Sequence, residues 1–308
     1  MKIGTMAAGA LALAVATPAL AQDGPPAASE ESVFDGDYVS VVAGGAYGPS
    51  YDGSDDYVFY PAGLLQGSLG GVDFTSRGAG ISLDFISDPA DGIGFDLGLS
   101  GQVRSSRARQ IKDPVVESLG KLDYAIEVGP TVGISIPHVL NAYDGLGFNI
   151  DAAWDINGAH GGMVIEPSIS YFTPLSRGIA ASLSLSAEHG DGEFMDYYYS
   201  VTPAQSLASG LPAFDADGGW SKAGGNLLLG FDLDGNLENG GLALFVVGGY
   251  TRMLGDAKRS PFTSVRGDAD QWLGALGLGY TFKRRRAGVR PTGSATSRAA
   301  DRRRRSCR

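Results

Sequence analysis

Apolar and polar residues alternate with a period of two along several stretches of the chain. The clearest stretches run over 93–103, 122–136, 146–157 and 179–189. In each stretch apolar residues occupy one set of alternating positions, and small or polar residues occupy the other. Because a β-strand places successive side chains on opposite faces, this pattern predicts strands with one apolar and one polar face. Aromatic residues stand toward the ends of the apolar faces, as is typical of strands that cross a membrane.

The stretch 270–282 shows the same alternation most completely. Trp272, Tyr280 and Phe282 belong to its apolar side, together with leucines, whereas the opposite side carries glycine, alanine and polar residues. Its length suits a tilted strand crossing a bilayer, with aromatic residues near both ends. We interpret it as the closing strand of an outer-membrane β-barrel.

The remaining alternating stretches set the strand count. Weaker patterns predict further strands over 38–47, 57–66, 162–173, 223–233 and 241–253. Pro61 is awkward for a central strand at 57–66. Residues 72–85 form either one long strand or two short strands hinged at 77–80, so ten to twelve strands fit the sequence. Short and long connections alternate, and twelve strands put both ends of the barrel in the periplasm. We therefore predict an all-β fold, a closed antiparallel transmembrane β-barrel of about twelve strands.

Composition divides the chain into four parts. Residues 1–21 combine Lys2, an apolar Ala/Leu-rich run and a small-residue cleavage site, which predicts a signal peptide; a membrane anchor is the alternative, but the run is short for a spanning helix. Residues 22–36 are rich in Pro, Ala, Ser and Glu and predict a flexible periplasmic leader. The barrel then takes residues 37–282, and residues 283–308 form a basic disordered tail.

Charge separates the tail from the rest of the chain. The chain has a formal net charge of −10, and residues 283–308 hold eleven Lys/Arg and one Asp, so the other residues carry −20. An acidic body argues against a nucleic acid partner. The tail either binds anionic lipid or murein, or is an accident such as a shifted reading frame after Phe282; its lack of periodicity favours the accident.

The polar faces of the predicted strands direct acidic side chains toward the lumen, with few basic residues opposite them. This predicts either a cation-favouring interior or a plug of polar side chains and water. The lumen-facing acids are Asp96, Asp123, Glu127, Asp151, Asp155, Glu166, Glu188 and Asp232.

The sequence contains little that predicts catalysis or a cofactor. Paired lumen acids would allow hydrolysis at a suitable separation, but no Ser/His/Asp signature accompanies them, and the three histidines are scattered. Asp52, Asp55 and Asp56 could bind a divalent cation, although a solvated acidic loop explains them as well. The single cysteine, Cys307, excludes a disulfide framework, and no Cys/His cluster predicts a metal site. We predict a non-enzymatic protein with neither cofactor nor bound metal.

Two loop motifs resemble those of a known family. The first, Tyr-Asp-Gly-Ser-Asp-Asp-Tyr at 51–57, resembles the Y-x-G-S-D-x-Y segment of the MipA/OmpV family of outer-membrane proteins. The second, which begins Tyr-Tyr-Ser-Val-Thr-Pro-Ala-Gln at 198–205, is similar to that family's Y-Y-G-V-x-x-x-Q segment, with Ser200 in place of glycine. The resemblance covers about residues 37–282. The motif positions are Tyr51, Gly53, Ser54, Asp55, Tyr57, Tyr198, Tyr199 and Gln205.

The resemblance implies a scaffold embedded in outer-membrane lipid. The best-known family member is named for its interaction with the lytic transglycosylase MltA, which it bridges to a bifunctional penicillin-binding protein that synthesises murein. Other members are described as surface adhesins. The family implies no catalytic residues. Both motif loops belong on the extracellular side or fold into the lumen, so contacts with periplasmic enzymes are expected on the short turns. A narrow cation-favouring channel for small solutes and a surface adhesin remain the alternatives.

Overall fold

A computed structural model describes residues 32–34, 36–86, 89 and 92–283. The predictions of a signal peptide over 1–21 and of a tail over 283–308, apart from Lys283, lie outside the described residues, as does most of the predicted leader. Within the described part of the chain, no helix is long and apolar enough to cross a membrane.

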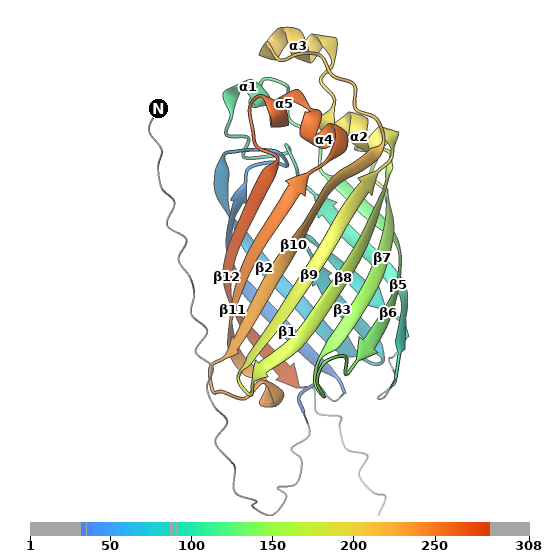
Figure 1. The fold of residues 1–308 in the computed structure, drawn as a ribbon, viewed down its shortest axis with the longest axis vertical. Coiled ribbons are helices and arrows are strands. Elements are labelled where there is room, and N and C mark those ends of the chain that lie inside the picture. The colour runs from blue at the N-terminus through green and yellow to red at the C-terminus, as the bar shows by residue number, and fades with distance from the viewer. Residues whose placement is uncertain (1–31, 35, 87–88, 90–91, 284–308) are drawn as a thin grey trace, which may run out of the picture. The chain divides into compact units, whose positions relative to one another are not determined.

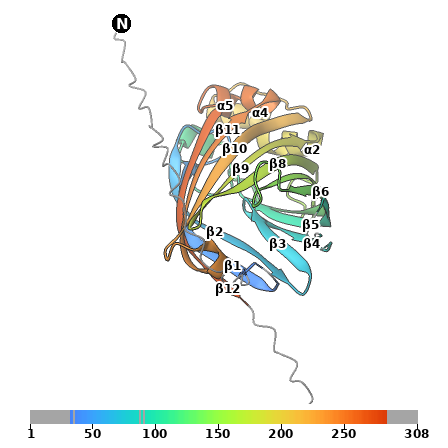
Figure 2. The same cartoon turned by 60° about the horizontal axis from the view of Figure 1, so that its bottom comes forward.

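Twelve antiparallel strands form one closed barrel in which each strand pairs with its neighbours in sequence, and β12 pairs with β1 (Figures 1 and 2). The fold class predicted from the sequence is therefore confirmed. The strands are β1 (Tyr38–Pro49), β2 (Tyr57–Leu69), β3 (Val72–Arg77), β4 (Gly80–Asp84), β5 (Gly94–Arg104), β6 (Ala125–Pro137), β7 (Gly145–Asp155), β8 (Met163–Ser176), β9 (Ile179–Gly190), β10 (Gly219–Asp232), β11 (Gly241–Met253) and β12 (Asp270–Lys283).

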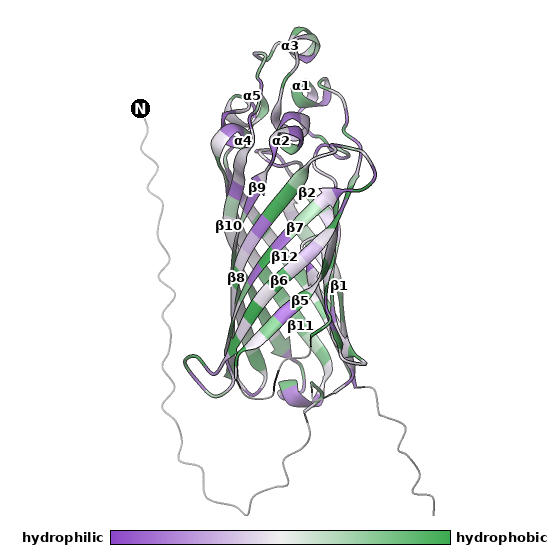
Figure 3. Ribbon diagram, turned by 90° about the vertical axis from the view of Figure 1, so that its right-hand side faces the viewer, coloured by the Kyte–Doolittle hydropathy of each residue, from purple (hydrophilic) through white to green (hydrophobic). Residues whose placement is uncertain are grey.

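The alternating pattern decides which side chains face lipid and which face the lumen. Outward positions expose apolar side chains such as Leu97, Leu183 and Leu278, whereas inward positions carry mostly glycine, serine and other polar residues. Figure 3 shows hydrophobic and hydrophilic residues interleaved along the strands. Because lipid lies outside the barrel, apolar side chains are stable at exposed positions that water would disfavour.

The prediction for residues 72–85 is resolved in favour of two strands. β3 and β4 pair from Asp73–Asp84 to Arg77–Gly80, so the 77–80 hinge is the turn of a short hairpin. Gly78 has a φ of 55° at this turn, a backbone conformation that glycine adopts without a steric penalty. Twelve strands bring both ends of the barrel to the end that carries the short turns (Figure 1).

Short helices in the long connections cover the opposite end of the barrel (Figure 1). We call residues 50–56, 105–124, 191–218 and 254–269 the cap. In outer-membrane barrels the longer loops are extracellular, so the cap lies on the extracellular side. The helices are α1 (Pro114–Glu117), α2 (Gly192–Tyr199), α3 (Pro203–Ser209), α4 (Gly255–Arg259) and α5 (Pro261–Ser264), and a 3₁₀ turn, η1 (Leu237–Asn239), lies at the periplasmic end.

Side-chain caps explain where the longer cap helices begin. Asp191 accepts a hydrogen bond from the N–H of Phe194 at the start of α2. Thr202 and Gln205 form a reciprocal capping box at the start of α3, which ends at Gly210 with a φ of 75°. These contacts satisfy N–H groups that have no partner inside a helix. The described residues of the cap hold most of the buried apolar side chains of the protein.

Candidate functional site

A layer of buried and partly buried ionisable side chains crosses the lumen directly beneath the cap. We call Asp52, Arg104, Glu127, His160, Glu188 and Lys222 the charged layer. The guanidinium of Arg104 lies at its centre, because its Nε is 2.8 Å from Glu127 Oε1 and its Nη1 is 2.8 Å from Glu188 Oε2. Glu127 and Glu188 are 0% and 2% exposed. Carboxylates buried this deeply require paired charges and several hydrogen bonds.

Neutral donors complete the coordination of the two glutamates. Glu127 accepts hydrogen bonds from Gln102 Nε2 at 2.7 Å and from the second guanidinium nitrogen of Arg104 at 3.1 Å. His160 Nε2 lies 3.0 Å from Glu127 Oε1. The hydroxyl of Ser221 donates to Glu188 Oε1 at 2.6 Å. Glu127 is thus held by residues of β5 and of one turn, and Glu188 by residues of β5 and β10.

Lys222 connects the charged layer to the first motif loop. Its ammonium lies 2.9 Å from Asp52 Oδ2 and 3.4 Å from Glu188 Oε2. Burial alone would raise the pKa of Asp52, but the ammonium of Lys222 outweighs this effect and lowers the pKa below its usual value. Asp52, which the sequence offered as a member of a cation-binding cluster, is therefore a partner of lysine. Among the described residues, no group of three or more His, Cys, Asp or Glu is arranged to hold a metal ion.

An ion pair between Arg77 and Asp151 lies below the charged layer, and a second acid, Glu166, stands beside it. Arg77, at the end of β3, reaches Asp151 of β7 at 2.5 Å. Asp151 stands directly opposite Glu166 of β8 in the strand register. Like charges at directly opposite positions repel each other. The acids of this region are Asp52, Glu127, Asp151, Glu166 and Glu188, and the bases are Arg77, Arg104 and Lys222, so acids outnumber bases.

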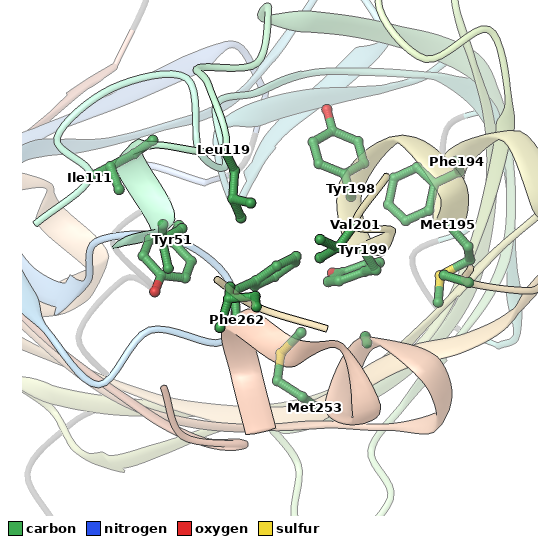
Figure 4. Packing of buried hydrophobic residues seen from close by; sticks show 14 of the residues in the cluster. Tyr51, Ile111, Leu119, Phe194, Met195, Tyr198, Tyr199, Val201, Met253 and Phe262 are labelled. Atoms are coloured by element: carbon green, nitrogen blue, oxygen red, sulfur yellow. The ribbon is translucent and has the colours of Figure 1, made fainter. Parts of the chain in front are cut away.

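Aromatic side chains of α2 close the space above the charged layer. The guanidinium carbon of Arg104 lies 4.8 Å from the ring centre of Phe194 and 5.8 Å from that of Tyr198. Rings this close to a cation attract it through the negative face of the π system. Figure 4 shows side chains from several cap segments converging on one apolar cluster, in which Phe194 and Phe262 are fully buried. The cap therefore fills the extracellular mouth with packed side chains.

Arg107 is the most unusual residue of the cap. It is 1% exposed and has a φ of 55°, and its Nη1 donates to the carbonyl oxygen of Tyr198 at 3.2 Å. Its guanidinium carbon lies 4.7 Å from the ring centre of Phe262. Burial lowers the pKa of Arg107 to about 10, so the guanidinium still carries its proton at neutral pH. Burial also raises the pKa of Tyr51 to about 12.

The first motif loop connects the cap to strand β12 through buried contacts. Gln271 of β12 accepts a hydrogen bond from the N–H of Gly53 and donates to the carbonyl of Ser54. The φ of Gly53 is 95°, and an added Cβ there would meet Thr263 Oγ1 at 2.2 Å, so this position requires glycine. Tyr51 is buried against Phe262, whereas Asp55 is exposed. The hydroxyl of Tyr57 accepts the N–H of Trp272.

The second motif loop packs on the same cluster. Tyr198 and Tyr199 belong to α2 and are 3% and 2% exposed. Gln205 completes the capping box of α3, and its Nε2 donates to the carbonyl of Leu119, which joins two cap segments. The geometry gives these motif residues a structural part in closing the mouth.

Several predicted lumen acids lie elsewhere than the sequence indicated. Asp123 precedes β6, and its N–H donates to Tyr197 in the cap, so the prediction that it faces the lumen is wrong. Asp155 binds the backbone N–H groups of the 157–161 turn, and Asp232 binds those of Asp234 and Asn236 at the periplasmic end. Asp96 lies on the inward face of β5, where its Oδ2 approaches the position of a Cβ on Gly133.

The expectation of few opposing bases is also wrong. Arg104 continues the inward positions of Asp96, Ser100 and Gln102 along β5, so strand parity contained a signal for it. Lys222 has the same parity as Asp232 on β10, so alternation also indicated its inward position; a β-bulge between Trp220 and Lys222 lies just before it. His160, one of the three histidines scattered along the sequence, reaches Glu127 from a turn. Trp272, Tyr280 and Phe282 face outward on β12, with 62%, 46% and 55% exposure.

Comparison with solved structures finds other outer-membrane proteins at low similarity. The crystal structure of the COG4313 outer membrane channel from Pseudomonas putida F1 is 14% identical and covers 84% of this chain and 100% of that chain, with a TM-score of 0.40. Ail, the attachment invasion locus protein of Yersinia pestis, is 9% identical over 80% of this chain and 99% of its own, with a TM-score of 0.23. At these TM-scores neither likeness supports a functional conclusion.

Comparison at the level of sequence is more informative. No curated protein is similar enough to the chain to count as a match. A family model described as "MltA-interacting protein MipA" matches residues 41–282, which include the barrel strands from within β1 to within β12 and the whole cap. The protein is therefore an outer-membrane β-barrel that belongs to the MipA family.

Proposed function

We propose that the protein is a non-enzymatic outer-membrane scaffold that docks murein-remodelling enzymes, a lytic transglycosylase and a murein synthase, at its periplasmic turns. The description of the family as MltA-interacting supports this proposal. The filled extracellular mouth supports it as well, because packed side chains oppose free diffusion through the barrel. Of the described residues, those within reach of periplasmic partners are the short turns and the segments that adjoin them.

The observation that carries the proposal is the periplasmic turn of residues 138–144, between β6 and β7. The carboxylate of Asp144 accepts hydrogen bonds from the N–H groups of Val139, Leu140 and Asn141 and from the hydroxyl of Tyr171. Burial alone would raise the pKa of Asp144, but the Tyr171 hydroxyl and the three N–H groups lower it below its usual value. One ionised side chain therefore fixes the whole turn.

This rigid turn presents large apolar side chains to its surroundings. Leu140 is 78% exposed and Tyr143 is 72% exposed, although both belong to residue types that proteins normally bury. Aromatic and aliphatic anchors held on a pre-organised turn are typical of binding hot spots, because little conformational entropy is lost on docking. The turn supplies the docking patch that the sequence pattern did not reveal.

A binding assay with a matched control tests the proposal. The double variant Leu140→Ser with Tyr143→Ser should reduce capture of a lytic transglycosylase by the purified barrel about tenfold or more, because hot-spot truncations cost about 2 kcal/mol each. Leu207→Ser, which removes an equally exposed leucine from α3 on the extracellular side, should leave capture unchanged. Heat-modifiable migration on gels checks that all variants form the barrel.

The outcomes separate the docking role from other functions. Loss of capture in the periplasmic variant alone supports the proposal. Capture that survives in a folded double variant removes this turn as the docking site, and failure of the wild-type barrel to capture any murein enzyme removes the scaffold function itself.

A narrow cation-favouring channel is the second candidate, and the register of β7 and β8 favours it. Asp151 and Glu166 are opposite each other on the lumen wall, and the acids near them outnumber the bases. Such an excess attracts cations into the lumen. In planar bilayers, cation-selective steps that weaken in Glu166→Gln would support the channel. Silent membranes at all voltages would exclude it.

A further inference from the structure

Among the described residues, β2 has a long ladder with one neighbouring strand and a short ladder with the other. β2 pairs with β1 over twelve residues, from Tyr57 to Ser68, but it pairs with β3 over only four, from Gln66 to Leu69. The cause is the short β3–β4 hairpin, whose strands have six and five residues. Six residues at about 3.3 Å each reach about 20 Å along a tilted strand, less than the apolar band of about 25 Å. Residues 57–65 of β2 therefore have no ladder partner on this side within the described part of the chain, and we call this side the free edge.

The chemistry of this edge discourages the addition of another strand. The N–H of Leu65 donates to Ser76 Oγ at 2.7 Å, so a side chain replaces the last ladder bond toward β3. By strand alternation, the backbone polar groups of Gly63, Pro61 and Phe59 point to the same edge. Pro61 has no N–H, and proline on an edge strand blocks pairing with a further chain. The proline that looked out of place in the sequence thus lies where a strand partner is missing.

Other parts of the structure frame the free edge on its remaining sides. Below it lies the turn of the β3–β4 hairpin. Across from it β5 ends at Arg104, where the N–H of Val103 donates to the carbonyl of Ala79 at 3.3 Å. Above it the N–H of Asp52 donates to Ser106 Oγ at 3.2 Å, which joins two cap segments. Contacts on these sides thus bound the interruption of the ladder, which we call the gap.

The gap lies at the depth of the lipid. Tyr47, Tyr57 and Phe59 form an outward aromatic group, with ring centres 5.5 Å and 4.6 Å from Tyr47. Outward aromatic residues near the strand ends mark the edge of the apolar band. The free edge runs from this group toward the periplasm, so it lies within the outer leaflet. Phe59 is 78% exposed there.

The inner side of the gap combines apolar and charged groups. The register with β1 places Tyr60, Ala62 and Leu64 on the inward face of β2, level with Ala46, Gly44 and Val42. At the hairpin end, Arg77 projects into the lumen and pairs with Asp151. An apolar surface next to a partly buried ion pair suits an amphipathic molecule, whose tail can contact β2 while its polar head contacts Arg77.

We propose that this gap is a lateral opening that connects the lumen with the outer leaflet and admits the apolar chain of an amphipathic lipid. The position in the apolar band and the proline on the edge favour an acyl chain over an extended peptide as the occupant. The opening bypasses the filled extracellular mouth. It is independent of the docking role, since it lies on a different part of the barrel.

Adjacent inward and outward residues on two strands provide a matched test. Single cysteines at Leu64 and Leu65 of β2, and at Leu228 and Leu227 of β10, are introduced in a Cys307→Ser background and labelled with bimane. The proteins are reconstituted in phosphatidylcholine vesicles that carry nitroxides on their acyl chains. In each pair the first residue faces inward and the second faces lipid, and β10 is paired with strands on both sides.

A lateral opening predicts unequal behaviour of the two inward positions. Quenching at Leu64 should reach about half of that at Leu65 and should be several-fold stronger than at Leu228, because a complete wall keeps acyl chains out of the lumen. A label at Tyr60 provides a second inward probe if Leu64→Cys fails to fold. Equal protection of Leu64, Tyr60 and Leu228 would overturn the proposal, as would quenching at Leu64 by a water-soluble nitroxide alone.

Discussion

Different kinds of side chains line the extracellular and periplasmic halves of the lumen. Beneath the cap, Arg104, Glu127 and Glu188 form a buried ionic centre that aromatic rings cover. Toward the periplasm, inward positions carry small side chains such as Ser168 and Ser184, which stand opposite further serines in the register. Serine and glycine tolerate many different neighbours, whereas each buried charge requires an opposite charge and hydrogen-bond partners. The upper half therefore depends on contacts between particular residues. The lower half depends mainly on the alternation of outward apolar and inward small or polar residues.

The largest expected effect follows removal of the central cation. Arg104→Leu leaves two buried carboxylates without their main partner and should lower the free energy of unfolding by about 3–5 kcal/mol. Urea unfolding in micelles, followed by heat-modifiable migration, measures the change. Arg252→Leu, which removes an arginine from an exposed ion pair with Asp270, is the control and should behave as wild type. Equal stability of both variants would mean that the charged layer does not distinguish the upper half.

Truncation of the cap's apolar cluster should have the next largest effect. Phe194→Ala removes a fully buried ring that packs on Arg104 and should cost about 3 kcal/mol of local stability. Because the strands remain paired, the cap should loosen while the barrel persists, and limited proteolysis should cut 203–209 faster. Leu207→Ala, at an 89% exposed position, is the control. Unfolding of the whole barrel in Phe194→Ala would show that cap and barrel form one cooperative unit.

Acid should loosen the cap before it affects the barrel. Burial alone would raise the pKa of Asp113, but its hydrogen bonds with Arg266 lower it, and Lys222 likewise lowers that of Asp52. A carboxylate whose folded pKa is lowered adds stability above its unfolded pKa of about 3.9, and this stability is lost as pH falls through the folded value. Near-ultraviolet circular dichroism of the cap aromatics should therefore decrease below about pH 4. Asp113→Asn should weaken the cap at neutral pH and flatten the pH response.

The smallest effect is expected in the periplasmic half. Ser184→Ala removes a hydroxyl from an inward position opposite Ser170 and Asn226 and should change the free energy of unfolding by no more than about 0.5 kcal/mol. The same urea assay measures it. A loss as large as that of Arg104→Leu would show that the lower half also depends on particular polar contacts, and the contrast between the halves would fail.

The strands could be predicted from the sequence because their signal is local. Alternation in 179–189 or 270–282 needs only neighbouring residues, and strand parity then decides which side chains face lipid. The same parity placed Glu127 and Glu188 inward. Parity failed outside regular pairing, at Asp123, which precedes its strand.

The composition of the candidate site could not be predicted in the same way. Arg104 lies 23 residues from Glu127 and 84 residues from Glu188 along the chain. Only closure of the sheet brings β5, β6 and β9 around one lumen, and only the fold of α2 brings Phe194 over the guanidinium. The apolar turn of residues 138–144 contains no periodic signal, since its rigidity comes from the hydrogen bonds of Asp144.

The sequence by itself determined the class of the protein: antiparallel strands with an apolar outer face, two family motifs and a closing strand with aromatic ends. The tertiary structure alone decided that the motif loops close the mouth, that bases neutralise most of the central acids, and that the short β3–β4 hairpin leaves β2 with a free edge. The physical reason is the distance along the chain over which each feature is determined. Side-chain alternation is fixed by the local geometry of the backbone, whereas ion pairs, packing and strand partners depend on segments that meet only when the barrel closes.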